Sequence, residues 1–255
     1  MRNDELMHYG VLGMKWGVRR YQNKDGSLTT LGRKRAKTIS KDGFDRISKS
    51  DNIKISNGNS LYRISTKKQD EGDTRYVSYR QNDRNFYKGY WGSILRESKP
   101  NANLYEQTYS IKSDIFIPSA KTRKNILSDL LNDDSVIKSI CEDASGKQQK
   151  QIEDSLRTAS KSWSKSKRAN YVAGFLSDRP DILSKYGENI VSKGFNAVID
   201  DNGRTVGEMP IILFTSNKSL NRERVEKIDR TIEEYSRSIY NEKKAEKYRN
   251  KTAGI

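Results

Sequence analysis

Short runs of strand-like sequence lie on both sides of a long stretch with helical spacing, and this order constrains the fold most. Alternation of apolar and polar residues favours half-buried β-strands. Such strand-like runs precede the helical stretch at residues 53–55, 61–65, 75–79 and 109–117. Two apolar runs, 195–199 and 211–214, follow it, and a turn signal, Asp-Asp-Asn-Gly at 200–203, lies between them.

Helical spacing dominates the middle of the chain. The expected helices are residues 119–131 and 135–141, one around Ile152 and Leu156, and residues 171–176 and 182–193. A shorter helix at 83–91 would place four aromatic residues on one face: Phe86, Tyr87, Tyr90 and Trp91. Strands that flank helices in this way predict an α+β fold with a largely antiparallel sheet.

Three segments divide the chain. Residues 1–50 form a basic leader, with 12 lysines and arginines against 5 acidic residues. We expect little packed structure there, apart from a short basic helix that Thr30 caps and that runs through Lys37. Residues 51–218 form the α+β domain. Residues 219–255 contain a long charged helix, predicted over 219–251 from the apolar stripe Val225, Ile228, Ile232, Tyr235 and Ile239.

Composition excludes several classes of protein. The chain has one histidine and one cysteine, His8 and Cys141, so a Cys/His zinc site and an intramolecular disulfide are excluded. No P-loop or dinucleotide-binding glycine motif is present. No apolar run approaches the roughly 20 residues that span a bilayer, and the N-terminus lacks the pattern of a secretory signal. The net charge of +16 favours polyanionic partners.

Arg63, Ser78 and Glu208 are the candidates for chemistry. Arg63 lies in the middle of a predicted strand; facing inward it must meet an anion or a carboxylate, and facing outward it pairs with a neighbour in solvent. Ser78 also lies in the middle of a predicted strand. It is either part of a site or an ordinary surface hydroxyl. Glu208 precedes the apolar run 211–214. A carboxylate at the entrance of a strand is either catalytic or a solvated loop residue. Asp200 and Asp201 favour turn formation.

The segment Trp-Ser-Lys-Ser-Lys-Arg-Ala-Asn-Tyr at 163–171 mixes aromatic and basic residues. Such interleaving suits phosphate contact together with base stacking. It is equally the pattern of a solvated basic helix face. The leader is the more basic candidate for nucleic acid.

The N-terminal stretch ELMHYGVLGMKWGVRRYQNKDGSLTTLGRKR resembles a segment of bacteriophage and prophage proteins, HxGxxGMKWGVRR followed by a YQNxDGSLT-like sequence. The matching residues are His8, Gly10, Gly13, Met14, Lys15, Trp16, Gly17, Val18, Arg19 and Arg20. In that family the segment is attached to varied domains near head and virion genes. The resemblance implies a recruitment segment that binds a virion or capsid protein through His8, Gly13, Met14, Lys15, Trp16, Arg19 and Arg20.

Residues 53–220 resemble ADP-ribosyltransferase-like domains of phage and mobile elements. The similarity rests on LYRIST, RYVSY and GFNAVIDDNG with GEMPIILF. It implies that Arg63 binds the phosphate of NAD, that Ser78 braces the site and contacts NAD together with Tyr79, and that Glu208 stabilises an oxocarbenium-like transition state. Arginine-specific members carry a glutamate two residues before the catalytic one, and Val206 stands there in this chain. Ser78 also lacks the Ser-Thr-Ser run of the family.

Three functions follow as hypotheses. The first is a phage or prophage virion-associated structural protein, recruited through its basic N-terminal segment and located in the virion or the host cytoplasm. The second is a mono-ADP-ribosyltransferase that uses NAD to modify a host protein. The third is a nucleic-acid-binding protein, with DNA as its partner.

Overall fold

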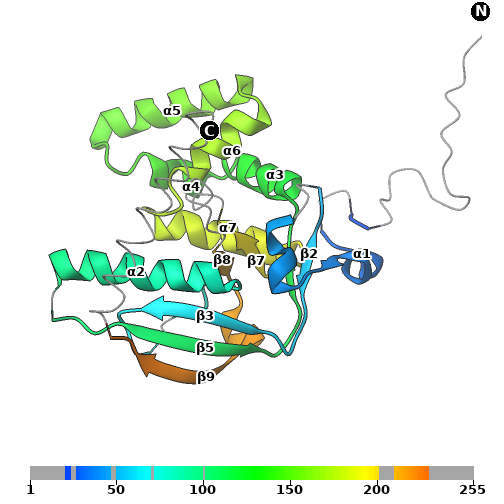
Figure 1. The fold of residues 1–255 in the computed structure, drawn as a ribbon. Coiled ribbons are helices and arrows are strands. Elements are labelled where there is room, and N and C mark those ends of the chain that lie inside the picture. Colours follow the sequence, from blue (N-terminus) through cyan, green and yellow to red (C-terminus); the bar gives the residue numbers. More distant parts are fainter. Residues whose placement is uncertain are drawn as a thin grey trace, which may run out of the picture.

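The structure is a computed structural model that describes residues 21–23, 27–46, 50–69, 72–99, 101–200 and 210–229 (Figure 1). Its strands are β1 (Lys37–Thr38), β2 (Ile53–Ile55), β3 (Ser60–Ser65), β4 (Arg75–Val77), β5 (Tyr105–Ile111), β6 (Ile115–Ile117), β7 (Ala197–Ile199), β8 (Ile211–Leu213) and β9 (Leu220–Lys227). Its helices are α1 (Thr30–Arg35), the 3-10 helix η1 (Lys41–Arg46), α2 (Gln81–Ser98), α3 (Ala120–Leu130), α4 (Asp134–Ile140), α5 (Gly146–Ser162), α6 (Lys165–Ala173), α7 (Pro180–Ser192) and α8 (Ser216–Ser219).

The described strands form three small sheets, ordered β1-β2-β6, β3-β5-β9 and β4-β8-β7. All of their pairings are antiparallel except that of β1 with β2. A single backbone pair, Tyr62 with Ser78, connects β3 to the end of β4. The predicted α+β class with largely antiparallel pairing is therefore confirmed.

In the sheet β4-β8-β7, strands β7 and β8 are buried on both faces, which explains their apolar sequences, whereas Tyr76 of β4 is exposed. Successive strand residues point to opposite faces. Ala197 and Ile199 of β7 belong to the core cluster between the sheets, and Val198 belongs to the cluster beneath the helices. Each position in β7 and β8 is buried. A strand that is covered on both sides reads as a continuous apolar run rather than an alternating one.

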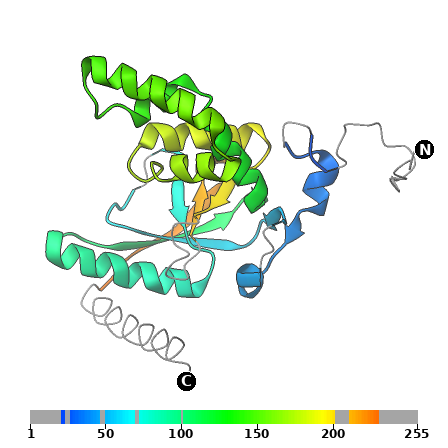
Figure 2. The same cartoon turned by 90° about the horizontal axis from the view of Figure 1, so that it is seen from above.

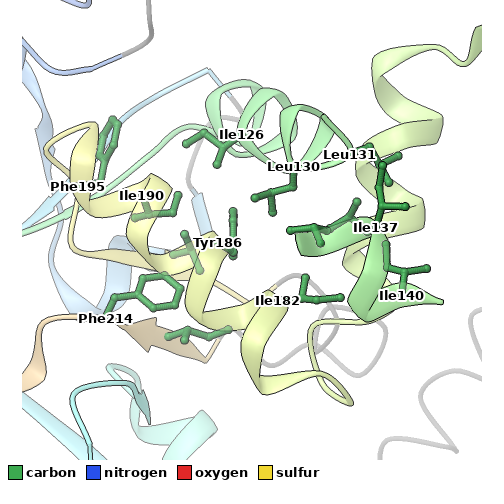
Figure 3. Packing of buried hydrophobic residues seen from close by; sticks show 14 of the residues in the cluster. Ile126, Leu130, Leu131, Ile137, Ile140, Ile182, Tyr186, Ile190, Phe195 and Phe214 are labelled. Atoms are coloured by element: carbon green, nitrogen blue, oxygen red, sulfur yellow. The ribbon is translucent and has the colours of Figure 1, made fainter. Parts of the chain in front are cut away.

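Helices α3 to α7 form a layer against this sheet, and Figure 3 shows their shared core. Polar caps begin several of these helices: Ser119 and Ser164 accept hydrogen bonds from backbone N–H groups in the first turns of α3 and α6. Helix α7 approaches the sheet closely at Gly187, where an added Cβ atom would lie 2.5 Å from the Phe214 ring. A glycine is therefore required at this contact.

Part of the leader belongs to the folded body, so the expectation of little packed structure is wrong for residues 27–46. Phe44 is fully buried and Ile39 nearly so, both in the cluster between the sheets. Leu28 packs into the helical core. Helix α1 is capped by Thr29, not Thr30, and ends at Arg35, not Lys37. The leader has few apolar residues, and basic residues separate them, so its sequence shows no pattern of a packed segment. The packing depends on contacts with residues far along the chain.

The predicted C-terminal helix is wrong where the structure describes it. Residues 220–227 form β9, which pairs antiparallel with β5 along its length. Ile228 then packs against Leu95 and Leu104. The strand is polar because it lies at a sheet edge with most side chains exposed. Ile232, Tyr235 and Ile239 lie outside the described residues.

Two further boundaries differ from expectation. The run 109–117 is two strands, β5 and β6, separated at residues 112–114 so that each joins a different sheet. Helix α2 is longer than the predicted 83–91 and continues to Ser98. Among the described helices, none has the length and apolar character that crossing a membrane requires.

Phe44→Ala tests whether the leader is part of the fold. We expect a loss of about 3–5 kcal/mol in the free energy of unfolding, because the ring is fully buried and packs edge-on against Tyr79. Urea denaturation followed by circular dichroism measures it. Leu31→Ala is the control, since Leu31 is 48% exposed and its loss should change stability by no more than about 0.5 kcal/mol. Equal stability of the two variants would contradict the packing of η1.

Candidate functional site

Strands β3 and β4 meet at one point and then separate. The N–H of Ser78 donates to the Tyr62 carbonyl at 2.7 Å, and the N–H of Tyr62 donates to the Ser78 carbonyl at 3.0 Å. Beyond this pair, β3 continues in its pairing with β5 and β4 in its pairing with β8. Two strand edges therefore diverge, and a strand edge presents backbone donors and acceptors to whatever lies beside it.

A cavity of about 200 Å³ lies where the strands separate. Its walls come from β3, from β4 with the residue after it, from α2, and from the residue before β8. The lining residues are Tyr62, Arg63, Ile64, Tyr76, Val77, Ser78, Tyr87, Tyr90, Trp91 and Pro210. Arg63 and Ser78, selected from the sequence, thus line the same cavity.

Arg63 lies on the inward face of its sheet. Directly opposed residues of an antiparallel pair share a face, and Arg63 opposes Gln107 while Leu61 opposes Tyr109. Leu61, Gln107 and Tyr109 are all buried. Of the two orientations open to Arg63 from the sequence, the structure has the inward one, and its side chain is half-buried. Arg63 is also one of the residues that line the cavity.

Ser78 is nearly buried, at 4% exposure, and its backbone makes both hydrogen bonds to Tyr62. It therefore stands at the vertex from which the two strand edges separate. A small hydroxyl at this point lets β3 approach β4 without filling the cavity.

Helix α2 covers the outer face of β3 and β5 (Figure 1) and is held there by a buried carboxylate. Glu106 of β5 is 3% exposed and forms ion pairs with Arg84 and Lys88 of α2, the latter at 2.6 Å. The Arg84 guanidinium also lies 4.6 Å from the centre of the Tyr62 ring. Two cations against one acidic group give this contact between α2 and β5 a net positive charge.

The α2 wall of the cavity is aromatic. Tyr87, Tyr90 and Trp91 line it, and the Tyr90 and Trp91 rings meet edge to face with centres 6.0 Å apart. Phe86 stacks on Tyr90 with centres 5.9 Å apart, which steadies the wall from behind. The predicted aromatic face of this helix is therefore real and forms the wall of a cavity. Flat aromatic ligands bind such surfaces by stacking.

Tyr76 adds a hydroxyl to the cavity. Burial raises the pKa of its hydroxyl, and the nearby Asp200 carboxylate raises it further. A tyrosine hydroxyl is protonated at neutral pH even without this shift, so Tyr76 can donate a hydrogen bond. Asp200 also connects to this region through its backbone N–H, which donates to the Pro210 carbonyl at 2.8 Å.

The structure does not bring Tyr79 to this cavity. Its side chain is 1% exposed and belongs to the core between the sheets, where the hydroxyl donates to the Ile39 carbonyl at 3.2 Å. Strand alternation accounts for the difference, because neighbouring Ser78 and Tyr79 point to opposite faces. Glu208 lies outside the described residues, as do the N-terminal residues His8, Gly13, Met14, Lys15, Trp16, Arg19 and Arg20.

Sequence reasoning missed part of the lining. Tyr62 and Tyr76 flank the selected residues in the same strands, and Pro210 begins the run leading into β8. No local signal marks them, since a cavity between two sheets depends on pairing between distant segments. The described residues contain no cluster of histidine, cysteine and carboxylate side chains that could hold a metal ion. The arrangement suits an anionic ligand with an aromatic ring.

Comparison with known proteins gives limited matches. A family model described as a family of unknown function (DUF7211) matches residues 2–23. A search of curated proteins found no match. Among solved structures, the chain is similar to one from the M. tuberculosis MbcT–MbcA toxin–antitoxin complex, with a TM-score of 0.36 and 8% sequence identity. That match covers 72% of this chain and 92% of the other, and at this TM-score it contributes nothing to the functional argument.

Glu106→Gln tests the attachment of α2. We expect a loss of about 2 kcal/mol or more in the free energy of unfolding, because Arg84 and Lys88 would keep their charges beside a neutral amide. Chemical denaturation measures it. The control is Glu226→Gln on β9: Glu226 stands opposite Glu106 but is exposed, so the change should be within about 0.5 kcal/mol. Similar losses in both variants would show that burial of the Glu106 charge is unimportant.

Proposed function

We propose that the cavity between β3 and β4 binds part of NAD and that the protein is a mono-ADP-ribosyltransferase acting on a protein. The observation that carries this proposal is the shared lining: Arg63 and Ser78 were both selected by resemblance to the transferase family, and both border one cavity. Two residues from different sheets reach one cavity only because their strands separate beside it.

The residues present fit such a ligand. A pyrophosphate needs a cation, and Arg63 supplies a guanidinium, which pairs with phosphate oxygens in a two-pronged geometry. A nicotinamide or adenine ring needs a flat apolar partner, which Tyr87, Tyr90 and Trp91 provide. The cavity of about 200 Å³ is smaller than a pocket for a whole drug-sized ligand. It would therefore hold one ring and the groups beside it.

When bound, NAD supplies a glycosidic bond between nicotinamide and ribose. This bond breaks as nicotinamide leaves, and an acceptor nucleophile takes the place of nicotinamide on the ribose. The protein's part is electrostatic and positional. Arg63 would hold the phosphates, Ser78 would fix the spacing of the strand edges, and Tyr76 would donate a hydrogen bond. A carboxylate is required where positive charge develops on the sugar, and we assign this role to Glu208.

The assignment of Glu208 rests on the sequence resemblance. Two facts support it: Pro210, two positions further along the chain, is a wall of the cavity, and Glu208 is the acidic residue nearest to Pro210 on its N-terminal side. Val206 in place of the usual glutamate argues for an acceptor other than arginine.

Titration calorimetry with NAD and a nicotinamide-release assay test the proposal on the full chain, because residues 27–46 are part of the fold. Arg63→Ala should weaken NAD binding at least about tenfold through loss of a charged hydrogen bond. Glu208→Gln should bind NAD but lose about 100-fold or more in turnover. Arg222→Ala, an exposed arginine that does not line the cavity, is the control and should behave as wild type. NAD affinity that is identical in the Arg63 and Arg222 variants would refute the cavity assignment.

We also propose that the N-terminal segment recruits the protein to a phage particle, as a second function. A family model matches residues 2–23 alone, which supports the view that these residues form a segment distinct from the domain. Its basic residues and Trp16 suit a partner surface that is acidic and partly apolar.

Deletion of residues 1–20 tests recruitment without disturbing the described fold. We expect an unchanged denaturation midpoint and loss of co-sedimentation with particles. Trp16→Ala in the full chain should weaken the association in the same direction. Co-sedimentation that persists after the deletion would end the recruitment proposal and leave the transferase proposal untouched.

A further inference from the structure

A stripe of side chains at four-residue intervals runs along α6 and the turns beside it: Trp163, Lys167, Tyr171 and Phe175. Residues four apart in a helix lie one above the other on the same face. The Trp163 and Tyr171 rings meet edge to face with centres 5.2 Å apart, and Tyr171 meets Phe175 at 5.4 Å. Lys167 Nζ lies 4.4 Å from the centre of the Trp163 ring. We call these four residues the α6 stripe.

The stripe is partly exposed: Lys167 and Tyr171 are exposed, whereas Trp163 and Phe175 are half-buried and pack against the helical core. The residues that α6 buries are Ala169 and Val172, and α6 packs on α3. Tyr171 keeps 36% of its surface exposed, and Ile152 of α5 keeps 47%. The hairpin of α5 and α6 stands at the outer end of the helical layer, away from α2 and β3 (Figures 1 and 2). This surface is therefore separate from the cavity assigned to NAD.

Four exposed lysines surround the start of α6. Lys161, Lys165 and Lys167 come from the hairpin, and Lys124 of α3 reaches Ser166 Oγ at 3.2 Å. The N-terminus of α6 adds partial positive charge at the same end. Residues 155–177 contain no acidic side chain. The exposed surface around the stripe thus combines cations with aromatic rings.

Several acidic side chains on the neighbouring elements pair with arginines. Asp134 pairs with Arg157 of α5, and Glu142 and Asp143 pair with Arg179. Glu153 and Asp154 add to the negative charge around Arg157. None of these pairs involves a lysine of the surface.

We propose that this surface binds single-stranded nucleic acid. The lysines contact phosphates, and Tyr171, supported by Trp163 and Phe175, stacks on an unpaired base. Stacking on an aromatic side chain requires a base face that a duplex conceals, which favours a single strand over a double one. An acidic protein segment would satisfy the lysines but would leave the exposed aromatic face without a role.

Fluorescence anisotropy of the full chain with a labelled single strand of about 12 nucleotides tests the proposal across a range of salt concentrations. Tyr171→Ala should weaken binding roughly tenfold, whereas Tyr171→Phe keeps the ring and should bind as wild type. The double variant Lys165→Gln/Lys167→Gln should weaken binding and lower the slope of log affinity against log salt by about 1.4. Circular dichroism verifies that each variant is folded.

The matched control for charge is Lys147→Gln/Lys150→Gln at the start of α5, where both lysines are exposed. It removes the same charge at the opposite end of α5 from Trp163 and should leave affinity and slope near wild type. Equal weakening in the two double variants would show binding by overall charge and overturn the proposal. So would equal affinity for a duplex of the same length, or full competition by polyglutamate. An affinity for the single strand that is unchanged in Tyr171→Ala would also refute the proposal.

Discussion

The backbone pair between Tyr62 and Ser78 is the constraint on which the site depends. Among the described residues it is the one backbone pair that connects β3 with the end of β4, and on either side of it the strands belong to different sheets. Toward Leu61 and Tyr79 the side chains fill the core. Toward Ile64 and Tyr76 the edges separate and enclose a cavity. The same two hydrogen bonds thus fix where the core ends and where the cavity begins.

The two walls of that cavity are anchored in different ways. One wall, β4, pairs with β8, a strand that is buried at every position, so the place of β4 follows from apolar packing. The other, β3, is paired with β5 and covered by α2, whose attachment includes a buried carboxylate between two cations. Close apolar packing tolerates little displacement of a strand. The strength of an ion pair, in contrast, depends on the geometry of the pair and on the presence of both partners. The α2 wall is therefore the one that sequence changes could reposition most easily.

The sequence predicted what local pattern determines and missed what distant pairing determines. The apolar runs at 197–199 and 211–213 are strands whatever their partners, and the cap residues of α3 and α6 mark their starts. Strand β9 is polar, and only its pairing with β5 makes it a strand. Arg63 and Ser78 could be selected by resemblance, but their shared cavity, and the burial of Tyr79 beside it, follow from which strand faces which. Phe44 looked like a residue of a basic leader because its partners lie far along the chain.

The order in which the elements are synthesised matters for this fold, because strands that pair lie far apart in the sequence. Strand β5 occupies the middle of its sheet, yet one of its two neighbours, β9, is made after the entire helical layer. Until β9 arrives, one edge of β5 lacks its native partner, and open edges of that kind invite pairing with other chains. Phe44 and Leu220 share a core cluster although they lie near opposite ends of the described chain. Formation of this core therefore waits until β9 has been synthesised, and its non-local contacts make folding intrinsically slow.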